Sequence, residues 1–389
     1  MSGTPALAGI TVLDFSTVGP ASRCSRILAD YGATVVKVGA PPKKAGVQIQ
    51  PVFHAYSGGR SLKQVRLDLK APEGRAALLR LAMGADVVIE SYRPGVVQRL
   101  RIGYDDLRRV NPRIIYCSTT GYGQDGPAAH WAGHDLNYLA VSGYLACSGR
   151  RADGGPPLPG ATIADSAAGG MHAAIAILAA LQKRAATGEG SYLDVAVSEG
   201  VLSLMSLAID EHLATGSEPG PGHDLLTGRY ACYDTYRTRD DKWLAVAAIE
   251  PAFYANLCKA LGLDKWITRQ LDDAVQDEIR ADFREAFAAR DRDDWVAELA
   301  PADTCVSPVY QVAELAGDAQ LQARGAFGEA RHPEHGVFRQ VAPVLAGMTR
   351  GGEPVAVRVA DETHTDALLA GAGYSTDEIE TLRRDGTIA

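Results

Sequence analysis

Residues 10–38, with the sequence ITVLDFSTVGPASRCSRILADYGATVVKV, decide the fold. The stretch begins with a short β-branched run that ends at Phe15, and a helical pattern follows from Ala21 to Tyr31. Gly32 stops that helix, and the next apolar run predicts a second strand. A strand, a covering helix and another strand indicate a parallel sheet, because parallel strands need a crossover connection between them.

The same alternation continues along the first half of the chain. A helix is predicted over residues 72–83, and strands are predicted over 85–90, 113–118 and 192–197. A long alanine-rich segment predicts a helix over 165–186. We therefore expect an α/β fold whose large domain has a parallel-sheet, Rossmann-like core.

A change of composition marks a second, smaller domain. The stretch 216–222, GSEPGPG, is the clearest linker in the chain. Beyond it, residues 236–250 predict a hairpin that turns at 239–241, and charged amphipathic helices follow. A C-terminal helix is predicted over 375–384. These patterns indicate a smaller α+β domain.

Composition restricts the class of protein. The 389 residues carry a formal net charge of −8, so there is no global basic field for nucleic acid. The six cysteines are scattered without a C-x-x-C pair, and we interpret them as structural thiols. The N-terminus has no signal-peptide pattern, and no run of about 18 apolar residues predicts a membrane span. The expected location is cytoplasmic.

Three residues, His134, Asp165 and Glu250, could carry acid–base chemistry. His134 and Asp135 stand at the predicted start of a helix, where a free amide can hold a developing oxyanion. Asp165 precedes the long apolar helix, and Glu250 ends an apolar strand. An imidazole and a carboxylate can serve as two bases on opposite faces of one carbon. Each residue also has a simpler interpretation, as a helix-start histidine, an N-cap aspartate or a solvated strand-end acid.

Basic clusters could meet an anionic ligand. Arg60 with Lys63, and Arg93 with Arg99, are such clusters, although each could equally be a solvated basic face. Residues 19–21 (Gly19, Pro20 and Ala21) would let a ligand approach the backbone at a helix start. The chain has no G-x-G-x-x-G or P-loop motif and no G-x-S-x-G motif. No metal site is expected, because His130 and His134 have no third ligand cluster beside them.

Several stretches, in this order, resemble the family III CoA-transferase superfamily, which includes formyl-CoA and carnitine CoA-transferases and the α-methylacyl-CoA racemases. The resemblance covers nearly the whole chain. The stretches that carry it are Gly9–Asp14, Leu67–Lys70, Pro72–Gly74, Tyr92–Gly95, Asn111–Arg113, Gly121–Pro127 and Gly373–Glu380.

Fewer residues decide the branch of the superfamily. Transferases resembling formyl-CoA transferase carry a catalytic aspartate at the position of Asp165, and usually an aromatic residue where this chain has His134. The run 133–138, GHDLNY, resembles the racemase version, and it ends in Tyr138, which we place with Tyr92 among the CoA-binding residues. The run 248–254 resembles the racemase segment whose glutamate, here Glu250, assists the histidine.

The resemblance implies an architecture and a reaction. It implies a large CoA-binding domain from 1–198 and 332–389, a small domain at 227–311, and linkers at 199–226 and 312–331. It also implies an interlocked homodimer, and an acyl-CoA thioester as substrate with CoA as part of it and no separate cofactor. The preferred reaction is racemisation of a 2-methylacyl-CoA, with His134 and Asp165 as bases.

Two alternatives stay open. The first is a CoA-transferase that works through an anhydride on Asp165. The second is a non-catalytic CoA-binding protein. One departure from the family concerns the CoA phosphates, because Gly39 and Ala40 stand where relatives usually carry a charged residue pair. Lys43 and Lys44 could substitute for that pair.

Overall fold

The computed structural model describes residues 4–16, 18–42, 59–351, 353–357 and 362–389. The chain divides into two compact units. The larger unit comprises residues 1–142, 159–205 and 320–389, and the smaller comprises 143–158 and 206–319. Both ends of the chain therefore belong to the larger unit. Lys43 and Lys44, considered above as substitutes at the CoA phosphates, lie outside the described residues.

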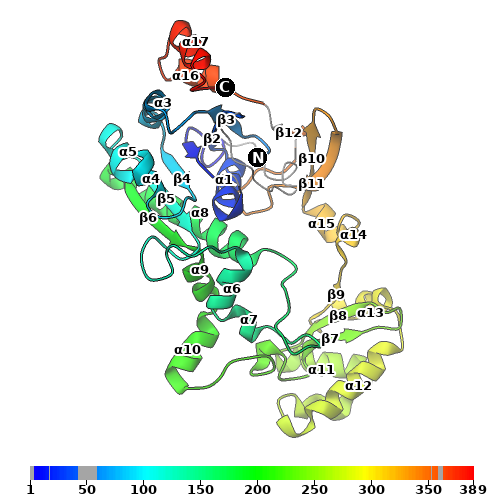
Figure 1. Ribbon diagram of the computed structural model, residues 1–389. Helices are drawn as coiled ribbons and strands as arrows, with labels where there is room; N and C mark the ends of the chain where they lie inside the picture. The colour runs from blue at the N-terminus through cyan, green and yellow to red at the C-terminus, as the bar shows by residue number, and fades with distance from the viewer. Residues whose placement is uncertain (1–3, 17, 43–58, 352, 358–361) are drawn as a thin grey trace. The chain divides into compact units, whose positions relative to one another are not determined.

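A six-stranded parallel sheet forms the centre of the larger unit, in the order β3-β2-β1-β4-β5-β6 (Figure 1). The predicted parallel α/β core is confirmed. The order reverses between β1 and β4, and sheets of this kind bind ligands outside the carboxyl ends of the strands near such a point. The strands are β1 (Thr11–Asp14), β2 (Thr34–Gly39), β3 (Lys63–Arg66), β4 (Val87–Glu90), β5 (Ile115–Thr120) and β6 (Ser191–Ala196).

Sequence analysis did not predict β3. Its four residues, KQVR, include three polar side chains and are too few to show an alternating pattern. They form a strand because parallel pairing with β2 provides the partner for their backbone groups.

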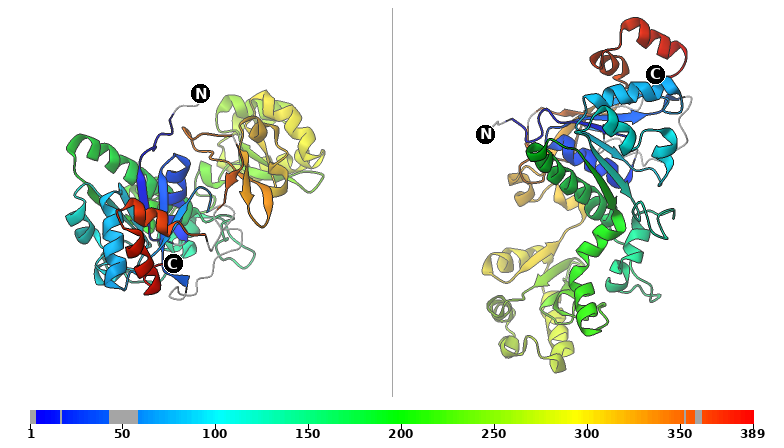
Figure 2. Two further views of the ribbon diagram at one scale, coloured as in Figure 1. Left: turned by 90° about the horizontal axis from the view of Figure 1, so that it is seen from above. Right: turned by 90° about the vertical axis from the view of Figure 1, so that its left-hand side faces the viewer.

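Helices cover both faces of this sheet (Figures 1 and 2). One face packs Leu28 and Ile177 of two helices against the strands, and the other packs Leu78, Leu107 and Leu369. Because helices cover both faces of the sheet, most strand residues are buried and the strands have nearly continuous apolar sequences. The first face is covered by α1 (Gly19–Asp30) and α8 (His172–Thr187), and the second by α3 (Pro72–Met83), α4 (Val96–Leu100), α5 (Tyr104–Val110), α16 (Thr365–Gly371) and α17 (Thr376–Arg384).

The helix predicted over 165–186 consists of two different helices. A π-helix, η2 (Ala164–Met171), leads directly into α8. Together they are the one helix in the described residues that is long and apolar enough to cross a membrane, and 44% of its most apolar window is buried in protein. Its Arg184 is buried and forms an ion pair with Asp86 at 2.8 Å. Packing in the larger unit accounts for its apolar character.

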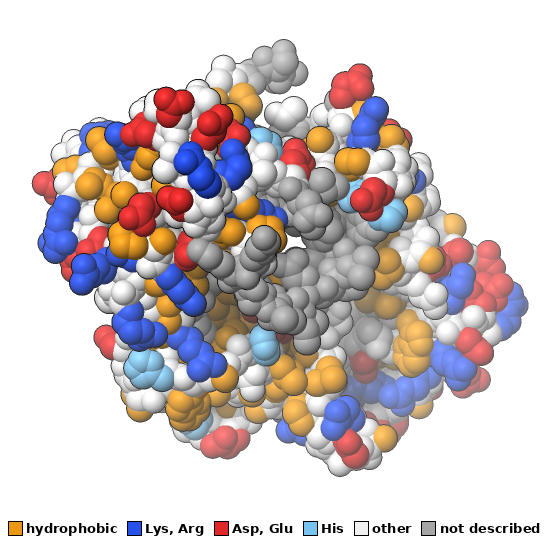
Figure 3. Space-filling view, turned by 45° about the horizontal axis from the view of Figure 1, so that its top comes forward, with side chains coloured by type: hydrophobic (Ala, Val, Ile, Leu, Met, Phe, Trp, Pro, Cys, Tyr) orange, Lys and Arg blue, Asp and Glu red, His pale blue; other side chains and the backbone are white. Residues whose placement is uncertain are grey.

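Two short helices and a small sheet complete the larger unit. The helices α6 (Asp135–Val141) and α9 (Val197–Leu204) flank η2. The sheet has the order β11-β10-β12. Its strands are β10 (Phe327–His332), β11 (Gly336–Val341) and β12 (Val355–Ala356), preceded by α15 (Ala319–Ala323). In Figure 3, acidic and basic side chains are mixed over the face shown.

The smaller unit is the predicted α+β module. The expected hairpin is present as β7 and β8, and β9 extends it into an antiparallel sheet. Tyr236, Phe283, Phe287 and Trp295 pack under this sheet. The elements are α7 (Tyr144–Cys147), α10 (Ser206–Thr215), β7 (Tyr233–Arg237), β8 (Trp243–Ala247), α11 (Pro251–Ala260), α12 (Gln276–Ala288), α13 (Arg292–Leu299), β9 (Val306–Val309) and α14 (Val312–Leu315).

One segment of the predicted large domain groups elsewhere. Residues 143–158 belong to the smaller unit, although they lie inside the predicted range 1–198. A contact within that unit shows why: the thiol of Cys147 donates to the carbonyl of Pro219 at 3.8 Å. Contacts between segments distant in sequence, which local patterns do not reveal, decide this grouping.

Candidate active site

His134 stands at the N-cap of α6, in an extended conformation that ends the preceding loop. Its backbone N–H donates to Oδ1 of Asn137 at 3.0 Å and so closes the first turn. The Tyr138 hydroxyl donates to the carbonyl of Gly133 at 2.6 Å. A Cβ on Gly133 would lie 2.7 Å from the ring of Tyr138, and one on Gly121 would lie 2.2 Å from it. The two glycines let Tyr138 lock the loop that presents the exposed imidazole.

Asp165 lies in the first turn of η2 and is joined to the histidine segment. Its backbone N–H donates to Oδ1 of Asp135 at 2.9 Å. The side chain of Asp135 therefore ties the start of α6 to the start of η2, two segments that are 30 residues apart. The structure thus brings the predicted His134, Asp135 and Asp165 together in the larger unit.

The close approach of η2 to its neighbours fixes the position of Asp165. A Cβ on Gly169 would lie 2.4 Å from Cβ of Pro20 in α1, and one on Gly170 would lie 2.8 Å from Cβ of Arg23. A Cβ on Gly200 in α9 would lie 2.0 Å from the carbonyl oxygen of Ala168. Such packing holds a helix in an irregular conformation, and π-helical turns are frequent at functional sites.

The surroundings of the Asp165 carboxyl raise its pKa above the ordinary value. Burial raises the pKa of Asp165, the charges of Arg23 and His134 lower it, and that of Asp135 raises it. Burial also raises the pKa of the Tyr138 hydroxyl to about 12, with a further contribution from Asp165. A carboxyl whose pKa is raised toward neutrality can alternate between acid and base.

Two of the predicted CoA-binding residues, Tyr92 and Arg99, line a cavity at the carboxyl ends of β2, β3 and β4. This strand-end cavity has a volume of about 630 Å³, and Tyr92, Arg99 and Lys70 line it together with Gly39 and Ala40. It lies at the sheet edge where α/β folds bind their ligands. Lys70 was not among the predicted residues, although it closes the quoted run 67–70.

The other predicted CoA residues have varied surroundings. Arg93 is exposed, and its charge lowers the pKa of Tyr138, so it faces the His134 loop. Gly19 begins α1 with φ +79°, a conformation that favours glycine, and Pro20 and Ala21 follow it in the first turn. Lys63 is exposed at the start of β3.

Arg60 has structural contacts in place of the expected phosphate contact. It is 4% exposed, and its guanidinium donates to both oxygens of Asp30 and to the carbonyl of Val341. These partners use its donors and join α1 to β11. The sequence showed a cationic residue after a glycine pair, but not the carboxylate that faces it.

Sequence analysis missed two acids that end buried strands. Glu90 at the end of β4 is 1% exposed, and it accepts hydrogen bonds from Ser118 Oγ and, at 2.7 Å, from the N–H of Tyr92. Burial raises its pKa to about 7. Asp14 at the end of β1 is fully buried and forms an ion pair with Lys37 at 2.7 Å. An acid directly after an apolar strand run was the available signal.

Glu250 lies in the smaller unit. It is the exposed N-cap residue of α11, directly after the segment that follows β8. Its pairing with His134 stays a prediction.

One further group in the larger unit has the chemistry of metal ligands. Ligand atoms of His332, Glu334 and His335 lie within 4.8 Å of one another at the β10–β11 turn. However, His332 Nδ1 accepts the N–H groups of Glu334 and His335 at 3.2 Å and 3.3 Å. These hydrogen bonds already account for the position of the ring.

Comparison with known proteins identifies the family. Residues 7–358 match the model of CoA-transferase family III, so the chain belongs to this family. It is 35% identical to the alpha-methylacyl-CoA racemase of Homo sapiens over 384 residues, which cover 98% of this chain and 97% of that protein. It is 30% identical to the acetyl-CoA:oxalate CoA-transferase of Acetobacter aceti over 334 residues, 81% of this chain and 84% of that protein.

A solved structure supports the same assignment. A CaiB/BaiF family protein from Brucella suis is similar with a TM-score of 0.76 and 26% sequence identity, over 95% of this chain and 100% of that chain. The relatives thus include both racemases and CoA-transferases, and this chain is an enzyme of that family.

Proposed function

We propose that the protein racemises the α-carbon of 2-methylacyl-CoA thioesters by proton transfer between His134 and Asp165. The observation that carries this proposal is the hydrogen bond from the Asp165 amide to the Asp135 carboxylate. It holds a carboxyl of raised pKa next to the segment that presents an exposed imidazole. The racemase relative, similar over nearly the whole chain, supports the same reaction.

The proton balance requires the two bases to start in opposite states. One base removes the α-proton and becomes protonated, and the electron pair of the broken C–H bond moves to the thioester oxygen as an enolate. The other base then gives its proton to the opposite face of the carbon. Burial raises the pKa of Asp165, which makes this carboxyl our candidate for the base that enters the cycle protonated.

The enolate oxygen needs hydrogen-bond donors. Asp135 is the first residue of α6, and its N–H has no carbonyl of that helix to bond. This amide is our proposed donor to the thioester oxygen. Glu250 would orient the imidazole and stabilise its charged form. The chemistry requires no metal or redox group.

The strand-end cavity is the proposed site of the CoA nucleotide. Arg99 and Lys70 supply positive charge for phosphates, and the ring of Tyr92 offers an apolar wall. Arg93 extends this positive charge toward the His134 loop. Gly39 and Ala40 also line this cavity. They stand where relatives usually carry a charged residue pair, so this difference from the family lies within the proposed nucleotide site.

Exposed apolar side chains support a homodimer. Helix α10 has no buried residue, and its Leu207 and Leu213 are 66% and 76% exposed. In α8, Ile175 is 66% exposed. Large apolar side chains exposed on helices are common at subunit interfaces. We propose that a second copy of the chain covers them.

The second candidate is transfer of CoA between acids. Asp165 would attack the thioester and form an acyl anhydride while CoA leaves as the thiolate. The carboxylate of the second acid would then attack the aspartyl carbonyl of this anhydride, which releases the first acid and forms a second anhydride. Attack of the thiolate on the acyl carbonyl of that second anhydride gives the new thioester and frees the Asp165 carboxylate. The transferase relative and the partial burial of Asp165 favour this candidate. In it, His134 has no essential role.

One assay separates the two candidates. The protein is incubated in deuterated buffer with a 2-methylacyl-CoA and without an acceptor acid, and deuterium at the α-carbon is measured. Exchange that His134→Ala abolishes is the expected result. Absence of exchange, together with CoA transfer to an added carboxylate that survives His134→Ala, would replace the racemase with the transferase.

A further inference from the structure

A second cavity in the larger unit runs beside α1. This α1 cavity has a volume of about 540 Å³ and is lined by side chains of α1, η2 and residues 340–348. Ile27, Met171, Leu345 and Met348 make its walls largely apolar. Its size and lining are those of a site for a small ligand.

The cavity also contains an excess of positive charge. Its lining includes the three arginines Arg23, Arg26 and Arg60, but one acid, Asp30. Asp30 accepts hydrogen bonds from Arg26 Nε at 3.0 Å and from Arg60 Nη2 at 2.6 Å. The single carboxylate is therefore shared by two guanidinium groups, and Arg23 is the arginine left over.

Polar atoms of this lining are buried without partners. Within the described residues, Arg23 Nε, Arg26 Nη1 and Gln340 Oε1 have no hydrogen-bond partner. Arg23 donates from Nη2 to Thr162 Oγ1, a neutral acceptor. Buried guanidinium donors are almost always paired, most strongly with carboxylates. These unpartnered atoms are themselves covered by protein, so the guanidinium groups of Arg23 and Arg26 act on a ligand mainly through their charge. An apolar cavity lined by three arginines and one acid, within the described residues, fits a ligand that brings an anionic oxygen.

The cavity adjoins the proposed catalytic carboxyl. Ser166, which follows Asp165 in η2, is part of the lining. The charge of Arg23 lowers the pKa of Asp165, so the guanidinium is close enough to act on that carboxyl. A group bound in the cavity would thus extend from the carbon on which Asp165 acts.

We propose that the α1 cavity binds the acyl part of the thioester, and that Arg23 and Arg26 select acyl groups ending in a second carboxylate. The proposal rests on the proposed function for the position of the thioester carbon. The apolar walls cover the methylene groups, and the arginines meet the distal carboxylate. Selection works by the attraction between the guanidinium groups and that carboxylate.

Matched pairs of thioesters test this selection. The 2-methylglutaryl-, 2-methyladipoyl- and 2-methylpimeloyl-CoA thioesters are compared with neutral counterparts that carry an isopropyl group in place of the distal carboxyl. Deuterium exchange at the α-carbon gives a kcat/KM for each compound. The ratio within a pair is the readout, because any effect of Arg23 on Asp165 acts on both members and cancels.

We expect at least one dicarboxylate to be preferred by about tenfold or more, and Arg23→Gln or Arg26→Gln to remove most of that preference. Arg23→Lys should restore part of it, since the charge returns without the planar fork. The matched control is Arg113→Gln, an exposed arginine of the same unit that donates to the Gly188 carbonyl. A wild-type preference for the neutral compounds, or equal ratios in wild type and variants, would overturn the proposal.

Calorimetric binding of the same pairs keeps this proposal separate from the proposed function. Tighter binding of the dicarboxylates that Arg23→Gln weakens, without any α-exchange, would support the cavity assignment and refute the racemase. Exchange of both members at equal rates, with equal affinities, would support the racemase and refute the cavity assignment.

Discussion

Two carboxyl groups, Glu90 of the larger unit and Glu314 of the smaller unit, respond to their surroundings in opposite directions. In the larger unit, burial raises the pKa of Glu90 to about 7 and also raises that of Asp165. In the smaller unit, the hydrogen bonds from Arg292 lower the pKa of Glu314 to about 2. The pKa of Glu90 is thus shifted toward neutral pH, whereas the lowered pKa of Glu314 keeps that carboxyl ionised down to acidic pH.

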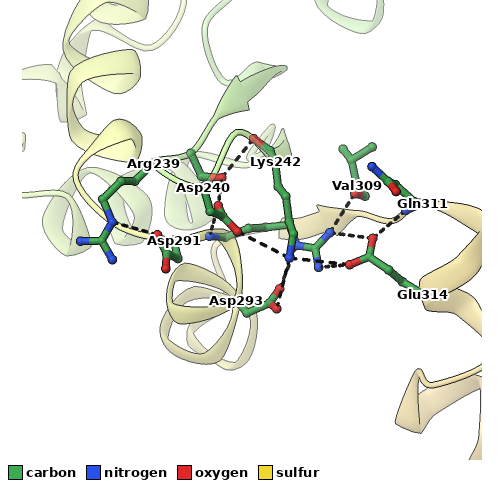
Figure 4. Close-up of polar contacts among 10 residues, drawn as sticks. Arg239, Asp240, Lys242, Asp291, Asp293, Val309, Gln311 and Glu314 are labelled. Carbon is green, nitrogen blue, oxygen red and sulfur yellow. Dashed lines mark hydrogen bonds and ion pairs between the residues drawn. The ribbon is translucent and has the colours of Figure 1, made fainter.

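The difference lies in what faces each carboxyl. Arg292, 2% exposed, donates from Nη2 and Nη1 to the two oxygens of Glu314 at 2.6 Å and 3.0 Å (Figure 4). The N–H of Arg292 also donates to Asp240 Oδ1 at 3.0 Å. Glu90 instead receives bonds from a hydroxyl and an amide, both neutral. Burial disfavours the charged form of a carboxyl, so its pKa rises when no cation lies beside it.

Replacing Asp165 with Asn tests the catalytic side of this contrast most strongly. Loss of an acid–base group should lower kcat for α-exchange by roughly 10³–10⁴-fold, without a change in the thermal midpoint. Asp194→Asn is the matched control, since burial also raises the pKa of Asp194 but its carboxylate accepts the N–H of Gln124 outside the site. Equal losses in the two variants would show that a raised pKa alone, rather than position, explains the effect.

Replacing Arg292 with Met tests the structural side. The variant removes both hydrogen bonds from the Arg292 guanidinium to Glu314, leaves that carboxylate with the more distant Lys242 at 3.9 Å, and frees the end of α14 from α13. The midpoint of thermal unfolding should therefore fall by roughly 5 °C. Scanning calorimetry measures the shift. Arg229→Gln breaks an ion pair with Asp273 that is about half exposed, and it should move the midpoint by less than about 1 °C. Similar shifts in both variants would contradict the distinction between buried and exposed pairs.

The contributions of Glu90 and Glu314 to stability should depend on pH with opposite signs. Because the folded pKa of Glu90 is raised from 4.5 to about 7, its burial costs nothing below pH 4.5. The cost grows as the pH rises to 7, and it reaches about 3 kcal/mol above pH 7. Glu314, with a folded pKa of about 2, stabilises the fold above pH 4.5 and loses that contribution as the pH falls toward 2.

Replacing Glu90 with Gln isolates the contribution of Glu90 to the pH dependence of stability. The amide can accept from the Tyr92 N–H and donate to Ser118, so the contacts persist while the titration disappears. Urea unfolding followed between pH 4.5 and 8 should show a flatter curve for the variant than for wild type. A parallel curve would mean that Glu90 does not titrate in this range. The variant retains the other titratable groups that interact with Glu90, which are Tyr92, Tyr116, Cys117, Tyr192 and Asp194.

The smallest expected effect concerns the one catalytic contribution assigned to the smaller unit. If Glu250 assists His134 as proposed, Glu250→Gln should lower kcat about tenfold when His134 is present, because the proposed carboxylate partner of the imidazolium is lost. In a His134→Ala background the same change should have no further effect. Additive losses in this double-mutant cycle would show that Glu250 acts independently of the imidazole.

The sequence by itself determined the elements and the chemical inventory. Short runs rich in β-branched and apolar residues, such as 10–15 and 85–90, indicate buried strands, and the run 133–138, GHDLNY, marks His134 and Asp135 as candidate catalytic residues. The sequence did not predict β3, because that strand depends on pairing with β2. It also did not predict the π-helical turn at Asp165, which depends on the contacts of glycines with α1 and α9.

Tertiary structure alone decided the partner of each charge. Arg60 looked like a cation available to a ligand or to solvent, yet Asp30 faces it. Arg23, which no sequence pattern singled out, has no carboxylate within hydrogen-bond distance in the described residues. Asp135 and Asp165 are joined across 30 residues by one hydrogen bond. Local sequence fixes periodicity and propensity, whereas the field at a carboxyl is set by atoms that only folding brings near it.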